Sequence, residues 1–227
     1  GNLYHITQIN FAYNTNHIEG STLTEEQTRY IYETNTLILE DGKTQTKVDD
    51  IIETANHFKL VDYMLEIADK TITSKMIKEF HKILKTGTSD ERKSWFKVGE
   101  YKALANEVGG YETSNPENVE KDMEDLLKWY NSLENVTFDD IIKFHSDFEE
   151  IHPFQDGNGR VGRIIMFKEC LRNNIVPFII LDEDKLFYYR GLREYQHGGE
   201  KGYLIDTCLN AQDQYKKLID KFIGRLK

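Results

Sequence analysis

Residues 152–163, with the sequence HPFQDGNGRVGR, decide the fold of this chain and hold its densest group of reactive side chains. An imidazole, a carboxylate and two guanidinium groups flank a Gly-Asn-Gly turn in this segment, and an apolar run follows it. Gly157 and Gly159 can adopt a positive φ without steric cost, and Asn158 tolerates it better than most residues. Because such a turn directs successive backbone N–H groups into one concavity, we expect the segment to bind an anion.

The apolar run from residue 160 onward predicts a buried helix whose first turns carry two arginines. The N–H groups at a helix N-terminus lack intrahelical acceptors and favour phosphate. Arg160 and Arg163 lie three residues apart and project from neighbouring positions on one face, and a guanidinium binds two phosphate oxygens at once. No GxxxxGK[ST] loop occurs and no GxGxxG follows a predicted strand, so this helix start is the candidate phosphate site.

Two other residues of the segment are suited to proton transfer and metal binding. His152 is the one residue here whose ordinary pKa allows base chemistry near neutral pH. Asp156 offers a carboxylate beside the expected phosphates, where it is a natural ligand of Mg²⁺. Each part alone has an ordinary structural explanation. Together they predict a site that holds a polyphosphate and its metal while removing a proton from an attacking hydroxyl.

The segment resembles the signature of the Fic family, H-P-F-x-[D/E]-G-N-G-R-x-x-R, and matches every specified position. The resemblance implies an all-α, Fic-like helical bundle with a short β-hairpin flap. It implies an enzyme that transfers AMP from ATP to a Ser, Thr or Tyr hydroxyl of a protein. In that enzyme His152 is the general base and Asp156 binds Mg²⁺, and the phosphates are bound by Gly157, Asn158, Gly159, Arg160 and Arg163.

A second motif, TNHIEG at residues 15–20, resembles the [S/T]-x-x-x-E-[G/N] inhibitory motif of Fic proteins that carry an N-terminal inhibitory helix. In such proteins the glutamate, here Glu19, pairs with the second arginine of the signature, here Arg163. An arginine engaged with a carboxylate cannot also bind a γ-phosphate, so the resemblance implies autoinhibition. The alternative is that Glu19 and Gly20 merely end a helix.

Two further regions extend the resemblance. Residues 95–102 and 108–113 resemble the flap that holds the target segment as an added strand, and aromatic and β-branched residues bounded by glycines favour a short hairpin. The candidate flap residues are Val98, Gly99, Tyr101, Val108 and Gly109. Residues 185–192 resemble the segment whose tyrosines line the adenine pocket. Tyr188 and Tyr189 are therefore candidate nucleotide-binding residues, with helix packing as the alternative, and Gln196 replaces a family asparagine.

Composition is that of an ordinary enzyme domain. The 227 residues suit a single Fic domain, 1–227, with the inhibitory helix within residues 1–23. The net charge of −10 argues against nucleic acid or an acidic membrane as partner. No apolar run reaches membrane-spanning length and no signal-peptide pattern opens the chain, so we expect a cytoplasmic protein. Cys170 and Cys208 are expected to be buried core residues.

Helical periodicity runs through most of the chain. Residues 24–27 form a capping box that predicts a helix through about Glu40, and Thr137 with Asp140 caps the helix that leads to His152. His81 and His145 lie on helical stripes and are expected to be structural. The other predicted helices cover residues 48–68, 76–84, 119–130, 182–196 and 203–225.

Three functions are compatible with these motifs. The first is an autoinhibited protein adenylyltransferase that uses ATP and Mg²⁺, acts on an unknown target protein and includes self-modification in its range. The second is the removal of AMP from a modified protein, with Glu19 positioning the water. The third is a non-catalytic nucleotide-binding module, which would need no base such as His152. Homo-oligomerisation is left open as a means of regulating the inhibitory helix.

Overall fold

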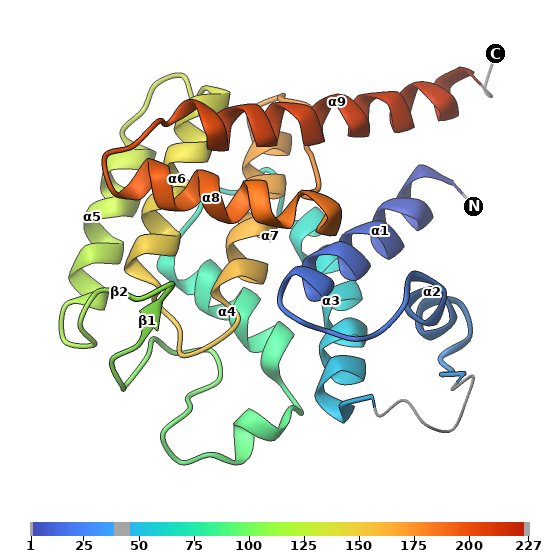
Figure 1. Ribbon diagram of the computed structural model, residues 1–227, viewed down its shortest axis with the longest axis horizontal. Helices are drawn as coiled ribbons and strands as arrows, with labels where there is room; N and C mark the ends of the chain where they lie inside the picture. Colours follow the sequence, from blue (N-terminus) through green and yellow to red (C-terminus); the bar gives the residue numbers. More distant parts are fainter. Residues whose placement is uncertain (1, 39–45, 225–227) are drawn as a thin grey trace.

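The computed structural model describes residues 2–38 and 46–224 and confirms the all-α fold (Figure 1). Its α-helices are α1 (Leu3–Ile18), α2 (Glu25–Thr34), α3 (Val48–Glu66), α4 (Ser74–Lys85), α5 (Val119–Asn131), α6 (Phe138–Ile151), α7 (Asn158–Arg172), α8 (Lys185–Gln196) and α9 (Gly202–Gly224). Two 3-10 turns, η1 (Ser89–Arg92) and η2 (Asp182–Asp184), and two short strands, β1 (Glu107–Val108) and β2 (Tyr111–Glu112), complete the described elements.

Helix α7 lies in the middle of the bundle and packs against α1, α3, α4 and α6 (Figure 1). Twelve of its 15 residues are buried, because neighbours surround it instead of covering one face. Its core residues join those of α3 to α6, α8 and α9 in one large apolar cluster. The arginines of the signature therefore start from the centre of the fold, where the backbone has little freedom to move.

Helix α6 brings the chain to the signature loop. The predicted capping box of Thr137 and Asp140 is present at its start. The helix ends at Ile151 and is capped by His152, whose φ of 51° is left-handed, and α7 begins after Gly157, whose φ is 85°. Phe154 is fully buried between them and stacks on His81 with a 4.0 Å centroid distance. This stacking anchors the loop to α4.

Helices α1 and α2 form the N-terminal part of the structure. The predicted capping box at residues 24–27 opens α2, but the helix ends at Thr34 because Asn35 adopts a left-handed φ of 53°. The predicted extension through about Glu40 is therefore wrong up to residue 38, and Glu40 itself lies outside the described residues. Leu23 and Ile31 pack with Ala12 and Phe58 in a second, smaller core cluster.

The hairpin is shorter than predicted. β1 and β2 pair antiparallel, with Val108 opposite Tyr111, around Gly109 and Gly110, which both have a positive φ as a type I′ turn requires. Residues 95–102 form no strand. Instead the Gly99 N–H donates to His81 Nδ1 at 2.9 Å and the hydroxyls of Tyr101 and Ser74 lie 2.8 Å apart. Of the candidate flap residues, Val98, Gly99 and Tyr101 therefore lie outside the hairpin, whereas Val108 and Gly109 lie within it.

Helices α8 and α9 close the bundle. The helix predicted for residues 182–196 is split into η2 and α8, and α9 matches the prediction for 203–225 except at Arg225, which lies outside the described residues. Cys170 and Cys208 are buried free thiols, as expected. Within the described residues, no helix combines the length and apolarity needed to cross a membrane.

Candidate functional site

A pocket of about 520 Å³ lies where the hairpin, α8, the end of α1 and the signature loop meet. Of the predicted site residues, those that line this pocket are Glu19, Val108, Gly109, His152, Gly159, Arg163, Tyr188 and Tyr189. The lining does not include Gly157, Asn158, Arg160 or Asp156, nor Val98, Gly99 and Tyr101. The predicted base and one of the two arginines therefore share a cavity with Glu19.

His152 is arranged to accept a proton. Its Nδ1 lies 3.3 Å from the carbonyl oxygen of Glu149, which can only accept, so Nδ1 carries the proton and Nε2 keeps a free lone pair. Burial lowers the pKa of His152 to about 4, and the charge of Lys102 contributes to this decrease. The imidazole is therefore neutral at pH 7, which is the form that a general base requires.

Arg163 is held by Thr15 and Glu19 at the end of α1. Its Nη2 lies 2.5 Å from Glu19 Oε1, and its Nε donates to Thr15 Oγ1 at 2.7 Å. Thr15 and Glu19 are four residues apart at the end of α1, so they face the same side of the helix. The guanidinium also donates to the Tyr188 hydroxyl at 3.3 Å, and Arg163 is only 3% exposed. The expected contact between Glu19 and Arg163 is thus present.

The two glycines of the turn have different roles. Gly157 adopts the expected positive φ, but Gly159 does not and belongs to the first turn of α7. A Cβ at Gly159 would lie 2.2 Å from Glu19 Oε1 and 2.9 Å from Arg163 Nη1. The expectation of a left-handed Gly159 is therefore wrong, and a glycine is needed there to leave room for the ion pair.

The Asn158 side chain holds the signature loop together. Its Oδ1 accepts from the Phe154 N–H at 2.8 Å and its Nδ2 donates to the Phe154 carbonyl at 2.8 Å. Both polar atoms of a residue that is 1% exposed are therefore used within the loop. In this arrangement the anion-binding groups at the start of α7 are its backbone N–H groups, which lack intrahelical acceptors.

Arg160 is engaged by residues outside the signature. It is buried and makes an ion pair with Glu53 of α3, while its Nη1 donates to Asn16 Oδ1 at 3.3 Å and its Nη2 to Asp156 Oδ2 at 3.4 Å. Sequence reasoning missed Glu53, because its stripe on α3 resembles any other half-buried helix face. Arg160 therefore lies behind the phosphate site and links α3, α1 and the signature loop.

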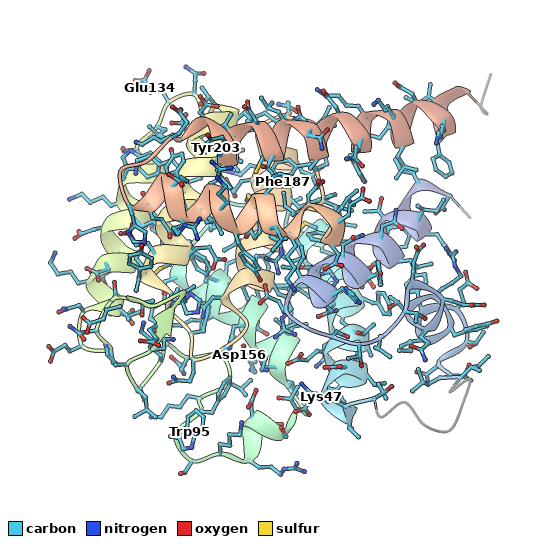
Figure 2. All side chains as sticks on the ribbon, viewed as in Figure 1. Lys47, Trp95, Glu134, Asp156, Phe187 and Tyr203 are labelled. Atoms are coloured by element: carbon cyan, nitrogen blue, oxygen red, sulfur yellow. The ribbon has the colours of Figure 1, made fainter. Side chains whose placement is uncertain are left out.

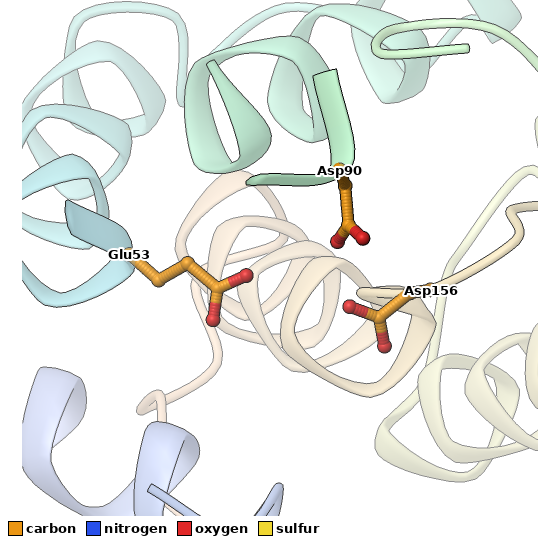
Figure 3. A group of neighbouring side chains, drawn as sticks. All are labelled: Glu53, Asp90 and Asp156. Atoms are coloured by element: carbon orange, nitrogen blue, oxygen red, sulfur yellow. The ribbon is translucent and has the colours of Figure 1, made fainter. Parts of the chain in front are cut away.

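Asp156 belongs to an acidic cluster with Glu53 and Asp90, whose carboxylate oxygens lie within 4.8 Å of one another (Figure 3). Lys85 Nζ contacts all three carboxylates, at 2.7 Å from Asp156 and 2.6 Å from Asp90. Burial alone would raise the pKa of Asp156, but Arg160 and Lys85 hold it well below the usual range for an aspartate. The carboxylate is therefore ionised at any physiological pH.

The donor atoms of Asp156 fit a divalent cation that is shared with phosphates. Arg160 and Lys85 both contact Oδ2, and the backbone N–H of Gly157 also bonds to the carboxylate and helps to lower its pKa. The side chain is half exposed, so a ligand from solvent can reach it. Mg²⁺ is commonly held by one or two carboxylates together with waters and substrate phosphates, and Asp156 meets that requirement.

The two tyrosines of α8 differ in exposure. Tyr188 is fully buried, and its hydroxyl accepts from Arg163 and lies 2.7 Å from His145 Nε2, so packing explains its position. Tyr189 is 40% exposed, lines the pocket and donates to the Ile18 carbonyl at 3.2 Å. Tyr189 is therefore the better placed of the two to contact the adenine ring of a nucleotide.

Glu149, which sequence reasoning missed, lies beside the base. Its Oε2 is 3.8 Å from His152 Nδ1 and its Oε1 is buried with no hydrogen-bond partner among the described residues. Burial raises the pKa of Glu149 to about 8; Arg163 opposes this increase and Glu19 adds to it. A glutamate three residues before a histidine is a common pattern in helices, so the sequence does not reveal that Glu149 lies beside His152.

Comparison with known proteins places these residues in a family. Residues 71–170 match the model of the Fic/DOC family. Protein adenylyltransferase fic-1 of Caenorhabditis elegans is 26% identical over 222 residues, which cover 96% of this chain and 41% of the relative. Protein adenylyltransferase Fic of Nematostella vectensis is 30% identical over 189 residues, covering 82% and 43%. The chain therefore spans less than half the length of these curated relatives.

Solved structures share the fold. A Fic domain containing signaling protein from Bacteroides thetaiotaomicron superposes with a TM-score of 0.72 at 25% identity and covers 97% of this chain and 84% of its own. Fic-1 from C. elegans superposes with a TM-score of 0.75 at 24% identity, covering 97% and 63%. Both alignments extend over nearly the whole of this chain, so the similarity is not confined to residues 71–170.

Proposed function

Since the chain belongs to the Fic family, we propose that it is a protein adenylyltransferase, which transfers AMP from ATP to a hydroxyl group of a target protein. We further propose that residues 1–227 act as a single Fic domain and that the segment up to residue 23 inhibits it. The observation that carries the proposal is the neutral His152 imidazole, with its free Nε2, in the same pocket as Arg163. A module that only binds nucleotide would not require such a base.

His152 takes the proton in the transfer step. The target hydroxyl donates its proton to Nε2 while its oxygen attacks the α-phosphorus of ATP. The bond from the α-phosphorus to the oxygen that bridges to the β-phosphate breaks, and pyrophosphate leaves. The imidazolium that forms still donates from Nδ1 to the Glu149 carbonyl, which keeps the ring oriented. Glu149 Oε2, at 3.8 Å, adds a carboxyl group on the same side.

The start of α7 holds the phosphates. Backbone N–H groups of residues 158–160 bind phosphate oxygens at the helix N-terminus, and Arg163 neutralises the terminal phosphates once it is free. The Asp156 carboxylate would hold Mg²⁺, which would neutralise charge that develops on the phosphates. Arg160 supports this arrangement by its bond to Asp156 Oδ2 at 3.4 Å. The ring of Tyr189 lines the pocket, where it can stack against the adenine ring of ATP.

Glu19 keeps the enzyme inhibited. While its carboxylate contacts Arg163, the guanidinium is not available to a γ-phosphate, so ATP binds without its α-phosphorus in line with the incoming hydroxyl. Displacement of α1 would release Glu19 and Thr15 from Arg163 together, because both lie on one face of that helix. The inhibited and active states therefore differ in the partner of one arginine.

Incubation with ATP and Mg²⁺ followed by intact mass spectrometry tests the proposal. We expect Glu19→Gly to raise AMP incorporation into the protein itself by about tenfold or more, which corresponds to about 1.4 kcal/mol. His152→Ala should bind ATP but incorporate no AMP. The matched control is Glu134→Gly, at an exposed loop glutamate far from Asp156 in Figure 2, which should behave as the parent.

Removal of AMP from a modified protein is the second candidate. It is favoured by the position of Glu19, which is partly exposed and lines the same pocket as His152, where a carboxylate is able to orient a water. If Glu19→Gly incorporates no more AMP than the parent but loses the ability to release AMP from a modified substrate, this candidate replaces the first.

A further inference from the structure

Lys102 lies between α4 and the hairpin and is buried although it carries a charge. Only 5% of the residue is exposed. Its Nζ donates to Asn106 Oδ1 and Thr113 Oγ1, both at 2.7 Å, and to the Ile151 carbonyl at 3.3 Å. Asn106 precedes β1 and Thr113 follows β2, so one ammonium group joins the two ends of the hairpin to the last residue of α6.

The same residue contacts the chain on both sides of the base. The Lys102 N–H donates to the Pro153 carbonyl at 2.8 Å, while its side chain reaches the Ile151 carbonyl. Ile151 and Pro153 are the neighbours of His152 in the sequence. Asn106 reinforces the connection, because its Nδ2 donates to the Phe154 carbonyl at 3.1 Å. Figure 1 shows the hairpin beside the loop from α6 to α7 that these bonds reach.

All three acceptors of the ammonium are neutral. Among the described residues no carboxylate lies within ion-pair distance of Lys102 Nζ. Burial accordingly lowers the pKa of Lys102 to about 8, with a small opposing effect of Asp122. A buried charge without a counter-ion is costly unless its hydrogen bonds are satisfied, so the three oxygens explain why a lysine persists here. Within the described structure, Lys102 is therefore held by hydrogen bonds to neutral oxygens and not by a salt bridge.

We propose that Lys102 is a positioning residue that sets the target-binding hairpin in register with His152. The proposal rests on the proposed function, in which the hairpin holds the target segment as an added strand. A general base must lie within about 2.6–3.2 Å of the proton it removes, and a displacement of about 1 Å is enough to slow a reaction strongly. Because Lys102 bonds to both ends of the hairpin and to both neighbours of His152, it fixes the separation on which the transfer depends.

The charge of Lys102 has a second effect on the same histidine. Burial is the main cause that lowers the pKa of His152, and the hydrogen bond to the Glu149 carbonyl raises it; of the charged groups, Lys102 lowers it and Glu19 and Asp156 raise it. Loss of the ammonium should therefore move the pKa of His152 upward. A substitution that keeps the positive charge should keep this effect.

The test compares Lys102→Met, which keeps the length but removes the donors, with Lys102→Arg, which keeps donors and charge. The exposed Lys97→Met is the matched control. Hydrogen exchange of the amides at residues 107–112 and an NMR titration of His152, identified from its loss in His152→Ala, are measured on the full chain. We expect Lys102→Met to exchange at least about tenfold faster in the hairpin and to raise the His152 pKa. Lys102→Arg should keep the hairpin exchange rate and the His152 pKa close to those of the parent. Lys97→Met should change neither the exchange rate nor the pKa.

The last measurement tests whether the contacts of Lys102 affect AMP transfer. In a Glu19→Gly background, Lys102→Met should lower AMP incorporation at least about tenfold while the dissociation constant for ATP stays within about twofold. Unchanged hairpin exchange and an unchanged His152 pKa in Lys102→Met would overturn the proposal, as would a Lys102→Arg variant that behaves like Lys102→Met. Because exchange and titration need no transfer, an absence of AMP adducts on Glu19→Gly itself would count against the proposed function and not against the coupling.

Discussion

At the scale of single residues, the site depends on Arg163, whose guanidinium contacts a single carboxylate of the described residues, that of Glu19. Arg163 donates to Thr15, Tyr188 and Glu19, and only the contact with Glu19 involves opposite charges. Gly159 leaves the space in which the Glu19 carboxylate lies. The ion pair between Glu19 and Arg163 therefore relies on a missing methyl group as much as on the two charges.

We predict that Gly159→Ala weakens inhibition without harming α7. An alanine Cβ would lie 2.2 Å from Glu19 Oε1 and 2.9 Å from Arg163 Nη1, and the helical backbone at this position accepts any L-residue. The carboxylate must therefore move, whereas a small shift of the guanidinium end relieves the second contact. In thermal melts, Gly159→Ala should destabilise the parent but leave the Glu19→Gly variant nearly unchanged, with a coupling energy of about 1 kcal/mol or more. Equal destabilisation in both backgrounds would show that the methyl group clashes with something other than Glu19.

The sequence identifies those site residues that lie in one contiguous motif. His152, Asp156 and Arg163 are recognisable because turn, helix start and charge all require a phosphate ligand. The sequence does not reveal the roles of Glu53, Lys85 and Lys102, because packing alone brings their partners near. These partners include Arg160 for Glu53, Asp156 for Lys85 and Asn106 for Lys102. A buried lysine or glutamate on a helical stripe looks the same in sequence whether it faces water or a distant arginine.

At the scale of elements, α1 is attached to α8 at the edge of the pocket. Tyr189 donates to the Ile18 carbonyl at 3.2 Å, and His17 Nδ1 lies 2.8 Å from Asp182 of η2. Both contacts lie within two residues of Glu19 and involve partly exposed side chains. These two partly exposed bonds therefore add to the buried Ile18 and to the Arg163 contacts that hold the end of α1.

We predict that Tyr189→Phe loosens the end of α1. The variant keeps the ring in the pocket and removes only the hydroxyl bonded to Ile18, a bond worth about 1 kcal/mol. Amides of residues 15–20 should exchange about fivefold faster, and basal AMP incorporation should rise a few-fold. Tyr203→Phe, at a partly exposed tyrosine of α9, is the matched control and should change neither. Faster exchange in the control as well would contradict the assignment.

Helix starts were predictable where a cap marks them, and the hairpin was predictable at residues 108–113 but not at 95–102. The capping boxes at Thr24 and Thr137 are both present. The aromatic residues at 95–102 resemble a strand, yet Phe96 is buried near His81, and the Gly99 N–H bonds to that histidine instead of to a sheet. The periodicity of a short segment does not distinguish pairing with a strand from packing on a helix.

At the scale of the whole molecule, several buried histidines set the response to acid. Burial lowers the pKa of His57, His81 and His145 to about 3, and that of His152 to about 4. Between pH 6.5 and 4 the unfolded chain binds protons at these residues and the native state does not, so the free energy of unfolding decreases as pH falls. The Glu149 carboxyl, with its pKa raised to about 8, acts in the opposite direction and offsets one of them.

We predict that the melting temperature falls by about 10 °C or more between pH 7 and pH 5. The net effect of three uncompensated histidines is at most about 4 kcal/mol per pH unit, which is large for one domain. Calorimetry at constant ionic strength measures it. A melting temperature that stays level over this range would mean that these imidazoles become protonated without unfolding.

The ammonium of Lys85 among three carboxylates has a consequence for what the protein requires from its surroundings. Dissolved cations can be diluted, exchanged or removed by a chelator, whereas a cation covalently tethered to α4 cannot. The chain thereby carries its own permanent counter-ion at the corner where Asp156 meets α3 and η1. The three carboxylates are therefore neutralised within the fold, whether or not the proposed Mg²⁺ is supplied.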